Sequence, residues 1–323
     1  MSPASPQRRS FAEPDYVPMK ATLWKEPFSD PAWVFERKLD GERCGALRRN
    51  GRVTLLSRTG HEMGAAYPEV AQALAIDGPD LLADGEIVAF YRGKTSFERL
   101  QQRMQIRDPK VAARSRVAVF YYTFDLLELD GEDLRELPLL GRKAKLKSAL
   151  AFTGPLRYTN YRRREGEAAF TLACQRGWEG VIAKRAESPY VPLRSRDWLK
   201  FKCEHGQELL IGGWTSPAGS RERFGALLVG YYEGAKLRYA GKVGTGFDRA
   251  TLRMLGDELE RLERPSSPFQ AGDPPRTARW AEPELVAEIG FAEWTRDGKL
   301  RQARYQGLRD DKLAREVVRE VPR

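Results

Sequence analysis

A β-hairpin signal just behind an isolated lysine constrains the fold of this chain most strongly. Two strand-like runs, residues 44–49 and 52–57, flank the dipeptide Asn50-Gly51, which is the strongest short-range signal for a hairpin turn. Upstream, residues 33–35 are apolar and predict a strand that ends near Lys38. The sequence therefore predicts antiparallel sheet next to a lysine in a polar turn.

The rest of the chain predicts two domains that differ in their pattern of helices and strands. Up to residue 203, strand candidates mix with segments of helical spacing, which favours an α+β architecture with antiparallel sheets. The strand candidates are residues 81–90, 117–127, 180–184 and 198–202, and the helix candidates are residues 68–76, 97–106, 142–150 and 167–176. Beyond residue 203, short glycine-separated strands at 209–214, 225–232, 236–239 and 285–294 enclose one helix at 249–262, which is typical of a small Greek-key barrel. We therefore expect a flexible leader over residues 1–16, rich in Pro, Ser and Arg, a first domain over residues 17–203 and a barrel over residues 204–323.

The charge balance favours a polyanionic partner. Lysine and arginine exceed aspartate and glutamate by 55 − 45 = 10 residues, and such a surplus attracts nucleic acid without locating the contact surface. No run approaches the roughly 18 apolar residues of a membrane span, and the N-terminal residues lack the apolar core of a signal peptide. We therefore expect a cytosolic protein without membrane association.

Cysteine and histidine spacing argues against a metal centre or a disulfide framework. Cys44, Cys174 and Cys203 lie far apart without a Cys-x-x-Cys pair, and the two histidines form no metal-ligand spacing. We expect three free thiols and no zinc site.

Lys38 begins the most informative series of short motifs. An amine attacks phosphorus only when it is deprotonated, so a lysine nucleophile needs neighbouring cations that lower its pKa and donors that absorb charge on the phosphate. The four residues Lys38-Leu39-Asp40-Gly41 are a weak match by themselves, and a solvated turn lysine is the simpler interpretation. Five further motifs follow in order: Ser57-Arg58-Thr59-Gly60, Asp84-Gly85-Glu86-Ile87-Val88, Phe124-Asp125-Leu126-Leu127, Glu179-Gly180-Val181-Ile182-Ala183-Lys184 and Trp198-Leu199-Lys200-Phe201-Lys202.

These six elements resemble, in order and spacing, the motifs of the covalent nucleotidyltransferases, the superfamily of DNA ligases, RNA ligases and mRNA-capping enzymes. The chain most resembles ATP-dependent DNA ligases of the bacterial ligase D type, from about residue 18 to residue 312. The barrel segments that carry this similarity are residues 211–215, 224–230, 239–247 and 307–312. The resemblance implies a nucleotidyltransferase (adenylation) domain followed by an OB-fold β-barrel domain.

The resemblance also implies a nick-sealing reaction that uses ATP. Lys38 would attack the α-phosphorus of ATP to give lysyl-AMP and pyrophosphate. AMP would then pass to a DNA 5′-phosphate, and the adjoining 3′-hydroxyl would displace it. Lys200 and Lys202 alternate on a strand, so both side chains can face one pocket. Together with Lys184 they are suited to neutralise the negative charge that develops on the α-phosphate.

The remaining site residues are implied by the same resemblance. Nucleotide binding would fall to Glu36 beside the adenine edge, Leu39, Arg43, Arg58, Glu86, Phe124 stacked on adenine, and Arg301 and Lys312 from the barrel domain. Mg²⁺ (or Mn²⁺) would be held by Glu86 and Glu179, because Mg²⁺ binds phosphates through one or two carboxylates and keeps several waters. In the family, the carboxylate that matches Glu86 binds either ribose or metal. Which of Glu86 and Glu179 binds the metal therefore stays open. The last family motif is imperfect here, because Ala303 replaces a proline and Tyr305 an apolar aromatic residue.

Three alternatives stay open at this point. An RNA ligase or an mRNA-capping-type nucleotidyltransferase shares the same chemistry, and a non-catalytic nucleic-acid-binding scaffold would use only the basic surface. The joint presence of Lys38, Glu86, Glu179, Lys200 and Lys202 argues against the scaffold.

The resemblance further implies a biological setting. The substrate would be nicked or broken double-stranded DNA, the process would be repair of double-strand breaks, and the end-binding protein Ku would be a candidate partner. The enzyme would be a monomer in the bacterial cytoplasm, associated with the nucleoid. It would be either a stand-alone enzyme or a module of a larger ligase.

Overall fold

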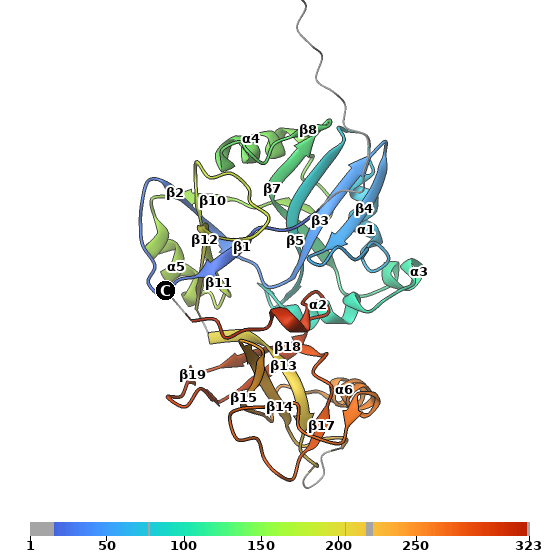
Figure 1. Cartoon of the computed structure of the whole chain (residues 1–323). Coiled ribbons are helices and arrows are strands. Elements are labelled where there is room, and N and C mark those ends of the chain that lie inside the picture. Colours follow the sequence, from blue (N-terminus) through green and yellow to red (C-terminus); the bar gives the residue numbers. More distant parts are fainter. Residues whose placement is uncertain (1–15, 77, 204, 218–221, 322–323) are drawn as a thin grey trace, which may run out of the picture. The chain divides into compact units, whose positions relative to one another are not determined.

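The computed structural model describes residues 16–76, 78–203, 205–217 and 222–321. The chain divides into two compact units, of which the first ends at Phe201 and the second begins at Lys202 (Figure 1). Except for Tyr16, the predicted leader lies outside the described residues. Among the described helices, none combines the length and the apolar character that crossing a bilayer requires.

One sheet of the first unit carries the lysine-bearing strand. In spatial order it consists of β1 (Lys20–Leu23), β12 (Arg194–Lys202), β11 (Gly180–Arg185), β2 (Trp33–Lys38) and β10 (Tyr161–Arg163). β2 runs antiparallel to both of its neighbours, whereas β1 and β12 are parallel. The first three residues of β2, Trp33 to Phe35, are buried, which explains why this apolar run is held as a strand.

A second sheet contains the predicted hairpin. In spatial order it consists of β4 (Arg52–Ser57), β3 (Glu42–Arg49), β5 (Leu81–Tyr91), β7 (Val119–Leu129) and β8 (Glu132–Asp133), with β6 (Lys94–Thr95) beside β5 and β9 (Leu156–Tyr158) beside β7. The hairpin prediction is confirmed. Asn50 and Gly51 have φ values of 48° and 76°, and both central residues of a type I′ hairpin turn require positive φ.

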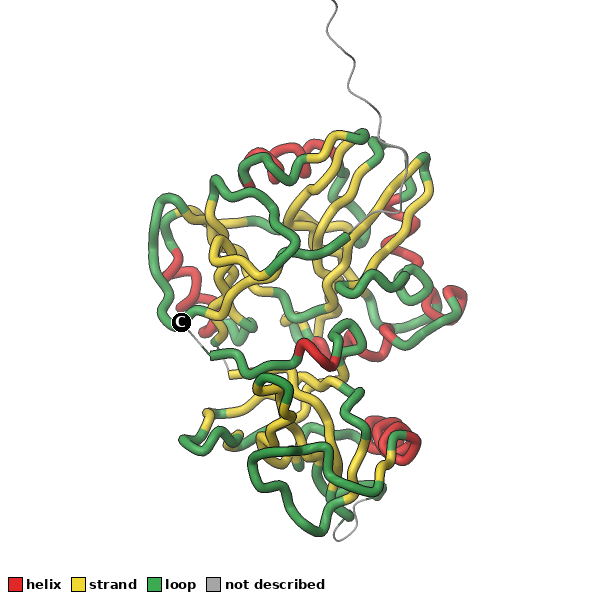
Figure 2. The backbone as a smooth tube through the Cα atoms, in the orientation of Figure 1, coloured by secondary structure: helices red, strands yellow, loops and turns green. Residues whose placement is uncertain are grey.

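The two sheets of the first unit, whose strands are yellow in Figure 2, share a core of packed side chains. Trp198 from β12 packs in one buried cluster with Leu82 of β5 and with Phe124 and Leu127 of β7. The opposite face of the second sheet is buried beneath helices, because α2 (Phe97–Met104) packs against β5 and α4 (Leu139–Ala149) packs against β7. Side chains at the ends of both sheets are therefore held in fixed positions by packing on more than one element.

The other helices of the first unit follow their sequence signals closely. α1 (Pro68–Leu74) lies within its predicted segment, and α5 (Gly166–Gln175) begins one residue before its predicted start at residue 167. α5 packs against β2 and β11. α4 begins three residues before its predicted start at residue 142. The short α3 (Pro109–Ala113) was not predicted; the side chain of Asp108 caps it by accepting from Lys110 N at 2.8 Å.

The second unit is a β-structure with one long helix. Its sheet consists, in spatial order, of β15 (Lys236–Val243), β14 (Leu227–Glu233), β13 (His205–Trp214), β17 (Arg279–Ala281) and β16 (Glu263–Arg264), with β18 (Val286–Phe291) beside β13 and β21 (Arg304–Leu308) beside β18. β19 (Glu293–Trp294) and β20 (Leu300–Arg301) form a separate pair, and the helices are α6 (Arg249–Arg261) and a 3-10 turn, η1 (Ala314–Glu316). The predicted strand over residues 285–294 is therefore two strands. The two strands are separated at Ala292, whose N–H donates to the carbonyl oxygen of Arg301 and not to a strand of the main sheet.

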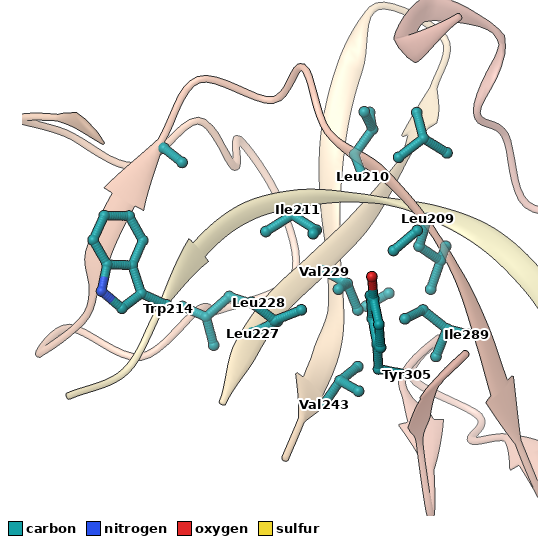
Figure 3. Packing of buried hydrophobic residues seen from close by; sticks show 14 of the residues in the cluster. Leu209, Leu210, Ile211, Trp214, Leu227, Leu228, Val229, Val243, Ile289 and Tyr305 are labelled. Atoms are coloured by element: carbon teal, nitrogen blue, oxygen red, sulfur yellow. The ribbon is translucent and has the colours of Figure 1, made fainter. Parts of the chain in front are cut away.

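The strands of the second unit enclose their own apolar core. Leu209 and Ile211 of β13, Val229 of β14 and Ile289 of β18 pack together around the ring of Tyr305 from β21 (Figure 3). All five side chains are buried. The second unit therefore has the separate hydrophobic core that is expected of an independent domain.

The cysteines correct one expectation. Cys174 and Cys203 are disulfide-bonded, whereas Cys44 is a buried free thiol. The prediction of three free thiols was wrong for two of them, because a disulfide depends on how close the fold brings the Cβ atoms, and spacing along the chain does not record this. Burial raises the pKa of the Cys44 thiol well above its usual value, which makes it a poor nucleophile.

Candidate active site

Lys38 is the last residue of β2, where the chain leaves the first sheet for the second. Its Nζ forms an ion pair with Oε1 of Glu179, the residue just before β11. Gly180 lies directly opposite Lys38 in the β2–β11 ladder, so the strand register brings the two side chains together. The side chains of Lys38 and Glu179 are 18% and 25% exposed. The structure therefore joins the predicted nucleophile to a predicted metal-binding carboxylate at a place that solvent reaches.

The turn after Lys38 is anchored to the segment that leads into α2. Oδ2 of Asp40 accepts from the backbone N–H of Phe97 at 2.9 Å, and the N–H of Asp40 donates to Oγ1 of Thr95 at 3.3 Å. Gly41 packs so closely on β5 that an added Cβ would lie 2.2 Å from the carbonyl oxygen of Ile87 and 3.0 Å from Cγ of Glu86. The predicted site residue Glu86 thus lies beside the turn that carries Lys38.

The packing at Gly41 makes a prediction about stability. In Gly41→Ala the new methyl group meets a backbone oxygen that cannot rotate away, so we expect a loss of about 1–3 kcal/mol in the free energy of unfolding. Gly64→Ala is the matched control, because a Cβ there meets nothing within 4 Å. Thermal unfolding followed by circular dichroism checks both variants. Equal melting temperatures for the two would contradict the tight packing.

Glu36 lies two residues before Lys38 and is the centre of a buried cluster. Its Oε1 is 2.5 Å from Nζ of Lys143, and its Oε2 is 2.7 Å from Nζ of Lys184. All three side chains are at most 2% exposed. Burial alone would raise the pKa of Glu36, but the two ammonium groups outweigh it and lower this pKa. We call Glu36, Lys143 and Lys184 the lysine cluster.

Lys184 is in an unusual electrostatic position. Its Nζ lies 4.2 Å from the ring centroid of Phe124 and 4.0 Å from that of Trp198. Among the described residues, no acceptor meets ordinary hydrogen-bond geometry at this Nζ, so its contact with Glu36 is an offset ion pair. Burial lowers the pKa of Lys184 to about 8; Glu36 and Asp125 oppose this shift, and the like charge of Lys143 adds to it. Lys184 is thus a buried cation with hydrogen-bonding capacity left for a ligand.

Phe124 is packed as a core residue and is contacted by cations. Its ring is 8% exposed and meets Trp198 edge to face, with centroids 6.0 Å apart. Cζ of Arg43 lies 4.7 Å from the ring centroid. Phe124 is thus a core residue whose ring has two cationic neighbours, Arg43 and Lys184.

Arg43 is held by a buried carboxylate that motif reasoning did not single out. Nε and Nη2 of Arg43 each lie 2.6 Å from an oxygen of Asp84, which is fully buried. The hydroxyl groups of Tyr16 and Tyr190 also donate to Asp84, at 2.9 and 2.6 Å. This geometry fixes the guanidinium in a bidentate pair, and burial accounts for the raised pKa of both tyrosines, which the charge of Asp84 increases further.

The other predicted residues of the first domain occupy separate places. Leu39 is buried in the turn after β2, and Arg58 is partly exposed in the turn after β4, where Oγ of Ser57 accepts from the N–H of His61. Lys200 lies opposite Leu23 in the β1–β12 ladder. Lys200 and Lys202 are both partly exposed on either side of buried Phe201, as strand alternation requires.

Three of the predicted residues are bonded within the second unit. Nζ of Lys202 donates to the carbonyl oxygen of Gly206 at 2.7 Å and lies 3.7 Å from Oε1 of Glu288. Arg301 forms an exposed ion pair with Glu293 at 2.6 Å. Nζ of Lys312 forms a short ion pair with Glu208. Their carboxylate partners must release these cations before they can bind phosphate.

The carboxylates fit a divalent cation only in combination with phosphate. Among the described residues, no three His, Cys, Asp or Glu side chains group closely enough to hold a metal ion. Glu179 and Glu86 supply hard oxygen donors beside the Lys38 turn. This donor set matches Mg²⁺, which is bound through one or two carboxylates together with substrate phosphates.

The fold and the site together define a class of protein. A two-sheet α+β unit, with Lys38 where the chain passes from one sheet to the other, is followed by a small β-structured unit. Residues 18–202 match the family model of the ATP dependent DNA ligase domain, and residues 220–312 match that of the ATP dependent DNA ligase C terminal region. The chain belongs to the ATP-dependent DNA ligase family.

Individual relatives agree with this assignment. The multifunctional non-homologous end joining protein LigD of Pseudomonas aeruginosa is 39% identical over 320 residues, which cover 96% of this chain and 37% of that protein. The LigD of Mycobacterium tuberculosis is 40% identical over 296 residues, which cover 89% of this chain and 37% of that protein. A solved structure described as mycobacterial DNA ligase D complexed with ATP and MES is 35% identical, covers 96% of this chain and 100% of its own, and has a TM-score of 0.69.

These comparisons confirm the family and the fold class that the sequence predicts, a nucleotidyltransferase domain followed by an OB-fold domain. The chain spans 37% of the length of the two curated relatives.

Proposed function

We propose that this chain seals 3′-hydroxyl/5′-phosphate nicks in double-stranded DNA with ATP, through a lysyl-AMP intermediate. The observation that carries the proposal is the position of Lys38, at the crossover between two sheets and in contact with Glu179. In the first step Nζ of Lys38 bonds to the α-phosphorus and pyrophosphate leaves. In the second, an oxygen of the DNA 5′-phosphate displaces the lysine and takes AMP. In the third, the 3′-hydroxyl oxygen attacks the 5′-phosphorus and AMP leaves.

The nucleotide would be held by cations and by the residues around the Lys38 turn. Lys184, Lys200 and Lys202 would neutralise the α-phosphate. Adenine would lie against Phe124 near Glu36 and Leu39, and Arg43 and Arg58 would bind nucleotide or DNA phosphate, for which a guanidinium fork is well suited.

Glu86 and Glu179 would hold Mg²⁺ or Mn²⁺. The ion would supply charge neutralisation on the phosphates. In this proposal Glu179, which now pairs with Lys38, would exchange Lys38 for the metal ion. The amine of Lys38 would then be released for attack.

The two domains would divide at residues 203 and 204, close to the limits of the two compact units. The first, residues 17–203, would bind ATP. The second, residues 204–323, would supply Arg301 and Lys312 to ATP and then contact DNA. The surplus of ten positive charges supports a polyanionic substrate.

The setting would be end joining at double-strand breaks. This is supported by the relatives named for non-homologous end joining. Ku is the partner that we propose for the full pathway. We further propose that the chain acts as a monomer in the bacterial cytoplasm, at the nucleoid where its substrate lies.

A labelling experiment tests the proposed function. Purified protein is incubated with Mg²⁺ and ATP or GTP labelled at the α-phosphate, resolved on a denaturing gel, and then chased with nicked DNA or nicked RNA. We expect label from ATP alone, with discharge and sealing on DNA. Label from GTP would favour a capping-type enzyme, sealing of RNA alone would favour an RNA ligase, and no label would favour a binding scaffold.

The lowered pKa of Lys184 predicts a pH dependence of nucleotide binding. Lys184 is charged below pH about 8 and neutral above it. If the phosphates bind the charged form, the affinity for ATP falls by up to about tenfold per pH unit as the pH rises through this value. Calorimetric titration of the unreactive Lys38→Ala variant measures this slope. In Lys38→Ala/Lys184→Met the slope should vanish, and an equal slope in both proteins would contradict the assignment to Lys184.

A further inference from the structure

Lys143 is a buried lysine that lies outside every motif of the site. It comes from α4, and its side chain is 1% exposed. Its Nζ lies 2.5 Å from Oε1 of Glu36 and donates to the carbonyl oxygens of Phe124 at 3.2 Å and Thr159 at 3.1 Å. The three protons of the ammonium group thus have three acceptors, and the side chain is held in one position.

Glu36 connects this fixed lysine to Lys184. One carboxylate oxygen contacts each lysine, and Glu36 has no room to rotate without breaking a buried ion pair. The cluster of one carboxylate and two ammonium groups carries one excess positive charge. A buried positive charge of this kind is costly unless an anion compensates it. The cluster is therefore suited to receive a phosphate or another anionic group at Lys184.

We propose that Lys143 is a positioning residue for lysine adenylylation: it anchors Glu36, and Glu36 in turn fixes Lys184 beside Phe124 and Trp198 to receive the nucleotide. This inference rests on the proposed function, since it names the group that prepares the same site. Lys143 does not itself contact the nucleotide, because its three donors are already used within the protein.

The charges around Lys184 determine what the loss of Lys143 does. Lys184 faces Glu36 from β2, Lys143 from α4 and Asp125 from β7, and Arg43 from β3 contacts the same Phe124 ring. Removal of Lys143 takes away a like charge and also frees Glu36 to move. Lys184 then keeps its proton to higher pH but loses its fixed position. A purely structural lysine would change stability without either effect.

The test combines single and double variants. We expect Lys143→Met to slow formation of lysyl-AMP from ATP in a single turnover by about tenfold to a hundredfold, by analogy with the loss that follows removal of a residue that orients a metal ligand. The variant should also raise the pH at which the affinity for ATP begins to fall. In the Lys184→Met background, the same change should cause no further loss of rate. Lys147→Met is the matched control, because Lys147 is exposed one turn further along α4, and it should leave the rate unchanged.

Several outcomes would overturn the proposal. Equal rates for Lys143→Met and Lys147→Met would do so, as would a full additional loss in the Lys184→Met background. If Lys143→Met fails to fold, Lys143→Gln replaces it, because the amide keeps hydrogen-bond donors without the charge; a rate within twofold of the wild type would then contradict the inference. Absence of label on the wild-type protein would overturn the proposed function itself, which separates the two failures.

Discussion

Replacement of Lys38 by alanine is expected to abolish covalent labelling by ATP, with a loss of more than about a thousandfold in the rate of nick sealing. The reason is that Lys38, at the end of β2 beside Glu179, supplies the amine that the lysyl-AMP route requires. The variant should fold normally, since the side chain of Lys38 is partly exposed and its ion-pair partner Glu179 is partly exposed as well. A denaturing gel with α-labelled ATP measures the labelling.

Two controls sharpen this prediction. Lys25→Ala removes a lysine that is 73% exposed and should leave labelling unchanged. A nick that already carries AMP on its 5′-phosphate should still be sealed by Lys38→Ala, because the third step needs no lysine nucleophile. Full labelling of Lys38→Ala would exclude Lys38 as the nucleophile.

Breaking the buried ion pair behind Phe124 should have the second largest effect. Arg142 binds both oxygens of Asp125, at 2.7 and 2.9 Å, and both side chains are fully buried. Arg142→Met leaves the carboxylate without its partner, so we expect a loss of about 3–5 kcal/mol in the free energy of unfolding. For a domain of this size the melting temperature should fall by roughly 6–20 °C.

Calorimetry on matched variants tests the role of this pair. Arg135→Ala breaks an exposed pair with Asp133 at 3.1 Å and should cost less than about 1 kcal/mol. The double variant Asp125→Leu/Arg142→Met should recover part of the loss, because no uncompensated charge remains. A melting temperature for Arg142→Met equal to that of Arg135→Ala would contradict this account. The pair matters for the site because Asp125 follows Phe124 and Arg142 precedes Lys143.

The elements with strong local signals could be predicted from the sequence. The Asn50-Gly51 turn needs only its own residues to favour positive φ, and the strands on both sides of it lie where the sequence predicts them. Lys38 and Glu179 were singled out by the order of the motifs, although their ion pair was not predicted. Local preference and motif order were sufficient for these features.

The partners that set the charge of the site could not be predicted. Lys143 is 107 residues from Glu36, and in the sequence it is one of several lysines in a segment of helical spacing. Tyr16 and Tyr190 both donate to Asp84, although they lie near the two ends of the first unit's sequence. Such contacts depend on how the two sheets and α4 pack, and no spacing rule along the chain records this. The start of β12 at Arg194 likewise depends on pairing with the distant strand β1.

The most direct test of this account is to locate the adenylylated residue by peptide mass spectrometry. The protein is incubated with ATP and Mg²⁺, digested, and mapped before and after addition of nicked DNA. The account predicts AMP on the peptide that contains Lys38, and its loss when the nick is sealed. AMP on a different lysine, or no adduct while nicks are still sealed, would contradict it.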